Sequence, residues 1–284
     1  MKTSVIIPHS NRKNNLFNTL LGLNRQSVVP TEVLVVDFDL DLEFTTDYKF
    51  DLRIISYTKS WKHLPVAAAR NLGVIHSKYD HLIFLDVDCI PNPSFIEHLT
   101  NIEPNRKALV MAEPHYLTKP IDNQWTFEEL ESLSIPHHKR PEIKEMILEK
   151  NYALFWSLCF HLSKSTFELL EGFDENYTGY GIEDTDFAFK TERQNIPFYL
   201  HPTHVFHQQH QLYRPPLNQL EAIVDNCNVF FEKWRTWPVP KILNAFTDMG
   251  YIRWTSQEST PIDIESRPTP EEMEHYILKD APYR

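Results

Sequence analysis

The alternation of short apolar strands with amphipathic helices near the start of the chain limits most strictly what it can fold into. Residues 4–8 and 32–36 are apolar runs rich in β-branched side chains, and Leu16, Leu20 and Leu23 form a helical apolar face between them. A strand, a helix and a second strand within about 40 residues require a right-handed crossover, which makes the strands parallel. The sequence therefore predicts an α/β fold with a mostly parallel central sheet flanked by helices.

The same alternation continues up to a pair of aspartates. Residues 52–57 form a third expected strand, residues 65–74 begin an alanine-rich helix, and residues 82–85 form a fourth strand that ends at Asp86 and Asp88. Side chains two apart in a strand point the same way, and ligands of open α/β sheets bind at the carboxyl ends of the strands. The two carboxylates could therefore share a divalent cation, or they could be solvated aspartates in a turn.

The pattern is less regular farther along the chain. Residues 113–150 are expected to form a polar excursion that could move, and residues 152–162 a single long apolar strand. Ser163 can cap a helix over residues 164–171, and residues 217–234 have the apolar periodicity of a core-facing helix. The tail that follows is irregular and spaced by prolines, so we assign no elements to it.

Composition excludes several classes of function. The formal net charge of −11 disfavours nucleic acid or an anionic membrane as a partner. No glycine-rich dinucleotide or P-loop motif follows the first strand. The three cysteines lie in apolar surroundings, which favours buried free thiols in a reducing compartment. Since no signal-peptide pattern or apolar stretch of about 20 residues occurs, we expect no transmembrane segment and a cytoplasmic location, with attachment to the inner membrane face as an option.

A second polar motif is built around a tyrosine. Half of the six glycines fall within ten residues, and two of them, Gly179 and Gly181, flank Tyr180. Glu183 and Asp184 follow on the first turn of an expected helix, where the helix dipole favours acids. A role at the start of a helix explains the two acids. It does not explain the glycines, which lose more backbone entropy on folding than other residues do. This motif is therefore a candidate site.

Four histidines lie close together after the last expected strand, at positions 201, 204, 207 and 210. If the chain is extended there, His204 and His207 lie on opposite sides, so a metal ion shared by both would require a turn. His201 and His210 are interpreted as ordinary surface or packing histidines.

Three motifs, in this order and spacing, resemble those of one enzyme family. They are A-A-R-N-x-G at residues 68–73, D-x-D at residues 86–88 and G-Y-G-x-E-D at residues 179–184. The chain resembles GT-A-fold glycosyltransferases of family 2 whose catalytic module is of the β-1,4-galactosyltransferase and chondroitin polymerase type. The resemblance covers roughly residues 3–112 and 151–216. The family tryptophan is replaced by Tyr180, and the family D-D-x-S by D-F-D at residues 37–39.

The resemblance implies a division of the chain and a role for individual residues. The expected parts are a nucleotide-sugar-binding half over residues 1–112, the excursion of residues 113–150, an acceptor and catalytic half over residues 151–216, and a C-terminal helix and tail over residues 217–284. The expected catalytic base is Asp184. The expected substrate contacts are Pro8, Ser10, Arg12, Asp37, Arg70, Asn71, Asp86, Tyr180, Gly181 and Glu183. The expected metal ligands are Asp88 and His207, with His204 at the position of a variable ligand.

The function implied is a metal-dependent, inverting transfer of a hexose or N-acetylhexosamine. The donor would be a UDP-sugar and the acceptor a hydroxyl group of a glycan or glycoconjugate. Carboxylate oxygen combined with imidazole suits Mn²⁺ better than the alternative, Mg²⁺. Two other interpretations stay open: a non-catalytic module of the same fold that binds sugar nucleotides or glycans, and a phosphotransferase that uses the D-x-D.

Overall fold

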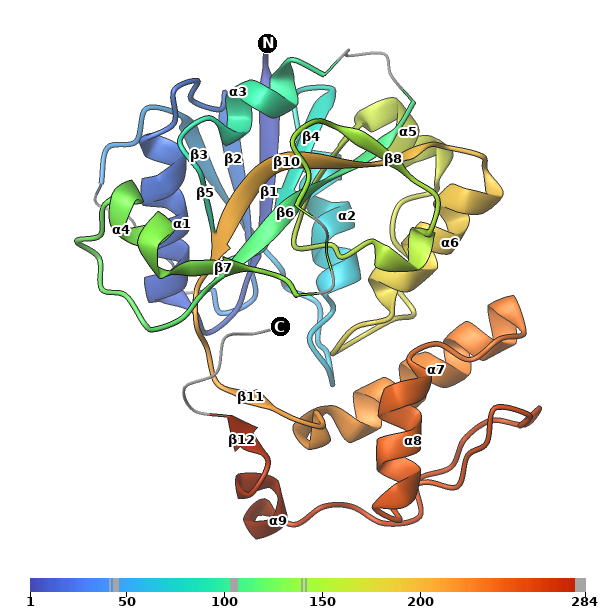
Figure 1. Ribbon diagram of the computed structural model, residues 1–284. Helices are drawn as coiled ribbons and strands as arrows, with labels where there is room; N and C mark the ends of the chain where they lie inside the picture. The colour runs from blue at the N-terminus through green and yellow to red at the C-terminus, as the bar shows by residue number, and fades with distance from the viewer. Residues whose placement is uncertain (41, 43–45, 103–106, 139, 141, 279–284) are drawn as a thin grey trace.

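The first four strands form the parallel sheet that the alternating pattern predicts. The computed structural model describes residues 1–40, 42, 46–102, 107–138, 140 and 142–278. The sheet begins with β1 (Thr3–His9), β2 (Glu32–Asp37), β3 (Asp51–Ser56) and β4 (His81–Leu85). These strands are parallel neighbours in the order β3-β2-β1-β4 (Figure 1).

Two crossover helices cover opposite faces of this half of the sheet. α1 (Lys13–Asn24) packs its leucines in a core cluster with Val5, whereas α2 (Val66–His76) packs Val74 in a cluster with Ile6. Successive residues of a strand point to opposite faces, so these two neighbours contact different helices. Burial of both faces explains why the strands are continuously apolar.

One antiparallel strand separates two parallel parts of the sheet. β9 (Cys159–Ser163) pairs antiparallel with β4 on one side and with β6 (Leu109–Leu117) on the other. β10 (Phe198–His207) runs parallel to β6, and β5 (Cys89–Pro91) pairs antiparallel with β10. Since β9 is antiparallel to both β4 and β6, β6 runs in the same direction as β4. β6 and β10 are therefore parallel to β1. The expected α/β fold with a mostly parallel sheet is confirmed.

The polar segment of residues 113–150, which we expected to form an excursion that could move, contains regular elements. Its first residues complete β6, and α4 (Phe127–Leu133) follows. β7 (Ser134–Pro136) and β8 (Ile147–Glu149) then pair antiparallel with β6 and β10. Trp125 anchors the segment in an apolar cluster. The polar composition therefore reflects exposed faces rather than a lack of elements.

The apolar run of residues 152–162 is a strand only at its end. Tyr152–Leu154 forms a 3₁₀ turn, η1, the following residues are irregular, and β9 starts at Cys159. At this point the chain crosses the carboxyl end of β4, where Leu158 O accepts a hydrogen bond from Asp86 N at 2.8 Å. Phe155 is buried and most of the other apolar side chains before Cys159 are partly buried, all without strand pairing, so an apolar run alone predicts too long a strand.

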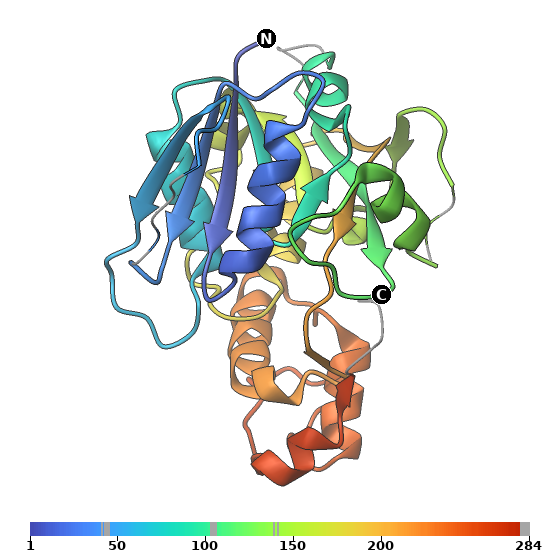
Figure 2. The same cartoon turned by 90° about the vertical axis from the view of Figure 1, so that its left-hand side faces the viewer.

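The C-terminal residues form a helical unit to which the carboxyl ends of the parallel strands point (Figure 2). α7 (Leu220–Trp234) packs against α8 (Pro240–Asp248) around buried residues such as Val224 and Phe246, which confirms the core-facing helix. The elements that complete the unit are η2 (Leu217–Gln219), α9 (Pro270–Glu274), and β12 (Ile277–Leu278) paired with β11 (Leu212–Tyr213).

Several smaller features complete the fold. Ser163 caps α5 (Lys164–Leu169) as expected, since its side chain accepts a hydrogen bond from Thr166 N. α3 (Phe95–Thr100) covers the sheet near β10.

The three cysteines are buried free thiols, as predicted. Among the helices of the described ranges, none has the length and apolar character needed to cross a membrane.

Candidate active site

The two aspartates after β4 lie in a turn rather than in the strand. β4 ends at Leu85, and Cys89 N donates a hydrogen bond to Asp86 O at 3.0 Å where β5 begins. Asp86 and Asp88 are therefore not alternate residues of a strand, and each carboxylate has its own partners. Both nevertheless line one cavity of about 940 Å³.

Strand pairing places His207 next to Asp88. β5 and β10 are antiparallel, and His207 lies opposite Cys89 in their register. His207 Nε2 lies 3.6 Å from Asp88 Oδ1, and Gln208 N donates a hydrogen bond to Asp88 O at 2.8 Å. One pairing thus joins two residues that are far apart in the sequence.

Asp88 is surrounded by basic groups. Its Oδ2 lies 3.7 Å from His210 Nε2 and contacts the Arg12 guanidinium. Burial alone would raise the pKa of Asp88, but His207, Arg12 and His210 hold that pKa below its usual value. Asp88 is therefore a buried carboxylate that stays charged. His210, interpreted from the sequence as a packing histidine, belongs to this cluster, and its three-residue spacing from His207 was the available signal.

The ligand chemistry at Asp88 fits a divalent metal ion. Ligand atoms of Asp88, Cys89 and His207 lie within 4.8 Å of one another. Burial, with the Asp88 charge beside it, raises the pKa of the Cys89 thiol, which disfavours the thiolate that a metal ligand requires. The remaining donors are one carboxylate and the imidazoles of His207 and His210, a combination suited to a divalent transition metal.

His204 faces away from this cluster, which corrects its assignment as a metal ligand beside Asp88. Its Nε2 lies 2.9 Å from Glu131 Oε1 on α4. Its Nδ1 accepts a hydrogen bond from the side-chain amide of Asn92 at 3.2 Å, so the ring hydrogen lies on Nε2 and points to Glu131. His204 and His207 point to opposite sides because β10 stays extended between them.

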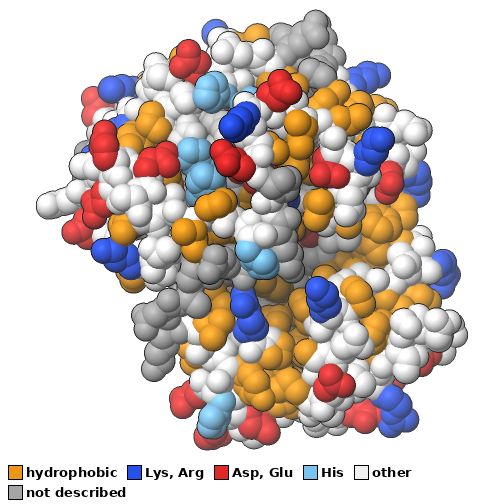
Figure 3. Space-filling model, viewed as in Figure 1, with side chains coloured by type: hydrophobic (Ala, Val, Ile, Leu, Met, Phe, Trp, Pro, Cys, Tyr) orange, Lys and Arg blue, Asp and Glu red, His pale blue; other side chains and the backbone are white. Residues whose placement is uncertain are grey.

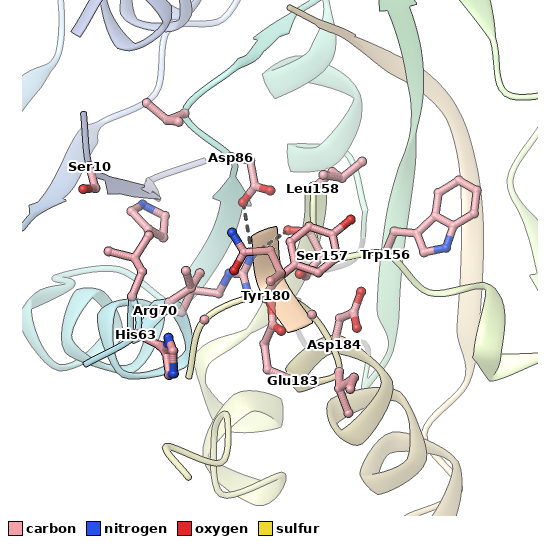
Figure 4. A pocket seen from close by; sticks show the side chains of 18 of the residues that line it. Ser10, His63, Arg70, Asp86, Trp156, Ser157, Leu158, Tyr180, Glu183 and Asp184 are labelled. Carbon is pink, nitrogen blue, oxygen red and sulfur yellow. Dashed lines mark hydrogen bonds and ion pairs between the residues drawn. The ribbon is translucent and has the colours of Figure 1, made fainter. Parts of the chain in front are cut away.

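Arg70 joins the D-x-D turn to the second acidic motif (Figure 4). Its buried guanidinium donates to Asp86 Oδ1 at 3.1 Å, to Glu183 Oε1 at 3.0 Å and to Ser157 O at 3.2 Å. Burial opposes the charge of Arg70, but the two carboxylates raise its pKa. Burial also raises the pKa of Asp86 to about 7 in spite of Arg70. Arg70 thus holds two carboxylates in the cavity, and its contact with a diphosphate stays a prediction.

Two of the expected substrate contacts have other roles in the structure. Asn71 donates a hydrogen bond to Phe173 O and accepts one from Phe173 N, both at 2.9 Å. Asp37 Oδ1 lies 2.8 Å from His9 Nδ1. Neither Asn71 nor Asp37 is among the described residues that line the cavity, and their contact with a substrate stays a prediction. The expected contacts that do line it are Pro8, Ser10, Arg12, Arg70, Asp86, Tyr180, Gly181 and Glu183.

The G-Y-G loop is held by α7. Gly179 has φ +82°, and a Cβ there would lie 2.5 Å from the Ala222 Cβ, so only glycine fits. Asn226 accepts a hydrogen bond from Thr178 N at 3.1 Å and donates to Thr178 O and Gly181 O at 3.0 Å. Sequence reasoning missed Asn226, although a polar residue on the core-facing side of the expected helix was a usable signal.

α6 (Glu183–Arg193) begins with the two acids of the motif. Ile182 precedes them in the left-handed conformation, with φ 75°. Tyr180 is 38% exposed and lines the same cavity as Asp184 (Figure 4). Burial, reinforced by the Glu183 charge, raises the pKa of Asp184 to about 7. Asp184 can therefore exchange a proton near neutral pH, as a general base must.

A D-x-D turn and an acidic helix start that face one cavity at the carboxyl end of a mostly parallel sheet are the features of the GT-A class. Residues 4–158 match the family model described as glycosyl transferase family 2. Residues 138–211 match the model described as the N-terminal domain of galactosyltransferase. The chain belongs to glycosyltransferase family 2, as its motifs predicted.

Curated proteins of similar sequence are glycosyltransferases and polysaccharide synthases. Validoxylamine A glucosyltransferase of Streptomyces hygroscopicus subsp. limoneus is 25% identical over 276 residues, which cover 87% of this chain and 60% of the relative. Chondroitin synthase of Escherichia coli is 24% identical over 227 residues, which cover 69% of this chain and 33% of the relative. The chain thus matches about three fifths of the first relative and a third of the second.

Solved structures share the fold. TarS 1-349 of S. aureus has a TM-score of 0.52 and 15% identity, and the match covers 81% of this chain and 66% of that one. GalNAc-T7 with UDP, GalNAc and Mn²⁺ has a TM-score of 0.55 and 13% identity, with 73% and 44% covered. These likenesses support the GT-A fold.

Proposed function

We propose that the chain is a metal-dependent, inverting glycosyltransferase that moves a hexose or N-acetylhexosamine from a UDP-sugar to a hydroxyl group of a glycan or glycoconjugate. The observation that carries the proposal is the single cavity that joins Asp88 and its two imidazoles to Asp184 at the start of α6. A non-catalytic binding module would need no proton acceptor such as Asp184. The structure of GalNAc-T7 with UDP, GalNAc and Mn²⁺ supports the choice of ligands.

Asp88, His207 and His210 would hold the divalent cation. One carboxylate oxygen with two imidazole nitrogens suits Mn²⁺ better than Mg²⁺, which prefers oxygen ligands and water. When bound, the cation would act as a Lewis acid on the leaving diphosphate. Arg12 lines the same end of the cavity and would supply a further positive charge there.

The loop after β1 would bind the nucleoside part of the donor. Pro8 and Ser10 line the cavity, and Ser10 Oγ donates a hydrogen bond to Asp39 Oδ1 at 3.1 Å. His9 is held from behind by Asp37. These contacts lock the loops after β1 and β2 together. Residues 1–112 would therefore supply the donor half of the site, and residues 151–216 the acceptor and catalytic half.

Asp184 would act as the general base. It would accept the proton of the acceptor hydroxyl as that oxygen attacks the anomeric carbon from the face opposite the departing diphosphate, which inverts the configuration. Glu183 and Tyr180 would contact the sugars beside it. Arg70 keeps the Glu183 and Asp86 carboxylates in place during this step.

Release of UDP from sugar nucleotides tests the proposal. The full chain is incubated with Mn²⁺ and, in turn, UDP-galactose, UDP-N-acetylgalactosamine, UDP-glucose and UDP-N-acetylglucosamine, with and without a chelator. We expect chelator-sensitive UDP release from at least one donor, and a loss of about 10²–10⁴-fold in Asp184→Asn, which still binds UDP. UDP binding without release from any donor would favour the non-catalytic module, and full activity of Asp184→Asn would remove the base assignment.

A further inference from the structure

The C-terminal helical unit supplies an apolar wall of the cavity. Ile223 on α7, Val239 just before α8 and Ile242 on the first turn of α8 all line it. Ile223 is buried, and the other two are partly buried and pack on the same apolar cluster. Figure 3 shows hydrophobic side chains gathered over this unit. We refer to these three residues as the C-terminal wall.

Val239 is held in a strained conformation within this wall. Its φ of 43° and ψ of 49° lie in the left-handed region, which a β-branched residue rarely adopts. It stands between two prolines, and its carbonyl accepts a hydrogen bond from Ile242 N at 2.9 Å as α8 begins. Strain of this kind gathers at ligand sites, where the position of a side chain matters more than the stability lost.

The C-terminal wall and the G-Y-G loop are connected through α7. α7 carries Ile223 and also Ala222 and Asn226, which hold the loop around Tyr180. Arg12 and the metal-ligating groups of the cavity gather around Asp88, and Arg70 lies between Asp86 and Glu183. Lys62 also lines the cavity, and its ammonium is paired with Glu221 of α7 at 3.4 Å. The described lining residues contributed by α7, α8 and η2 carry no charge. The anionic donor therefore belongs at the Asp88 end, and the wall faces the remaining ligand, the acceptor.

We propose that the C-terminal wall is an acceptor subsite for an apolar group, an aromatic ring or alkyl chain, attached to the sugar that receives the transfer. The proposal rests on the proposed function, because Asp184 marks where the acceptor hydroxyl lies. A cavity of about 940 Å³ is near the upper end of the usual range of about 300–1,000 Å³, which leaves room for an acceptor beside the donor. Burial of an apolar group on this wall would favour such acceptors over free sugars.

The experiment compares p-nitrophenyl and methyl β-glycosides of glucose, galactose, N-acetylglucosamine and N-acetylgalactosamine as probes of the full chain with UDP and Mn²⁺. Saturation-transfer NMR reports which probe protons contact the protein and gives competitive affinities. We expect transfer to the aryl protons and about tenfold tighter binding of at least one aryl glycoside than of its methyl counterpart. Val239→Asn tolerates the left-handed backbone but loses the apolar surface, so it should weaken aryl binding about tenfold and leave UDP binding unchanged.

Arg235→Asn is the matched control. Arg235 also has a left-handed backbone, with φ 55°, but it is exposed at the end of α7 and is not among the described lining residues. This variant should bind the probes like the wild type, and Ile242→Ser provides a second change in the wall. Equal affinity for aryl and methyl glycosides, no binding of either, or aryl binding unchanged in Val239→Asn and Ile242→Ser would overturn the proposal. UDP release by hydrolysis of the donor needs no acceptor and reports separately on the proposed function.

Discussion

The buried position of Asp184 disfavours its charged form and also suits the residue to accept a proton near neutral pH. Burial beside Glu183 disfavours its charged form, so its pKa rises to about 7. A general base acts only when deprotonated. We therefore expect the rate of UDP release to increase between about pH 6 and about pH 8, with a midpoint at about 7, when it is measured at saturating donor and Mn²⁺.

The same shift in pKa has a consequence for stability that provides an independent check. An acid whose pKa is raised by folding contributes stability at pH values below its unfolded pKa, and this contribution is lost as the pH rises through about 7. Asp184→Asn should therefore raise the melting temperature more at pH 8 than at pH 5. A flat pH–rate profile in the wild type, together with equal melting shifts at both pH values, would contradict this account of Asp184.

Motif and residue type were sufficient to nominate some site residues and insufficient for others. Asp88, His207 and Asp184 could be nominated because their chemistry and order along the chain are recognisable. His210 was missed because its spacing from His207 was the one signal in the sequence, and its approach to Asp88 depends on the pairing of β5 with β10. Asn226 was missed because its position on the core-facing side of a helix does not show its partners, which are backbone groups of a loop distant in sequence.

Among the elements, α7 has the clearest influence on the site. Asn226→Ala would remove three hydrogen bonds and leave backbone groups of Thr178 and Gly181 without their partner. We expect a loss of about 1–3 kcal/mol in the free energy of unfolding, since buried polar groups without partners are costly. We also expect UDP release to slow by about tenfold or more, because Tyr180 and Asp184 would lose their fixed positions.

Asn228→Ala separates these two effects. Asn228 lies on the same helix and makes two hydrogen bonds of similar kind, accepting from Ile262 N at 2.7 Å and donating to Ile262 O at 2.9 Å. The partner of both hydrogen bonds is Ile262 of the C-terminal tail rather than the G-Y-G loop. A comparable loss of stability with an unchanged rate is expected. Equal rates in the Asn226 and Asn228 variants would show that α7 does not position the loop.

The elements themselves were predictable where local signals agreed. The βαβ units and the capped helix after Ser163 combine periodicity with start and stop signals, and the structure has them. Residues 152–162 were assigned too long a strand because an apolar run can be buried without pairing. Residues 113–150 were assigned no elements because strands such as β7 and β8 have only three residues each, which is too short to show a strand pattern.

At the scale of the whole molecule, the sheet and the C-terminal unit both contribute residues to one cavity. The parallel strands direct their carboxyl ends to it, and α7 and α8 close it from the other side (Figures 1 and 2). Asp186 on α6 fastens the two parts, since its buried carboxylate accepts hydrogen bonds from Tyr177, Lys233 and Trp234. No local pattern predicts such a junction, because its partners lie on separate elements.

The central claim is that Asp88 and His207 hold a divalent cation that couples to the nucleotide of the donor. Calorimetric titration of UDP into the full chain, with Mn²⁺ or with a chelator, tests it most directly. We predict at least about tenfold tighter binding of UDP with Mn²⁺, equivalent to about 1.4 kcal/mol, and loss of this difference in Asp88→Asn and His207→Ala. An affinity for UDP that is the same in the wild type with Mn²⁺ and with the chelator would contradict the claim.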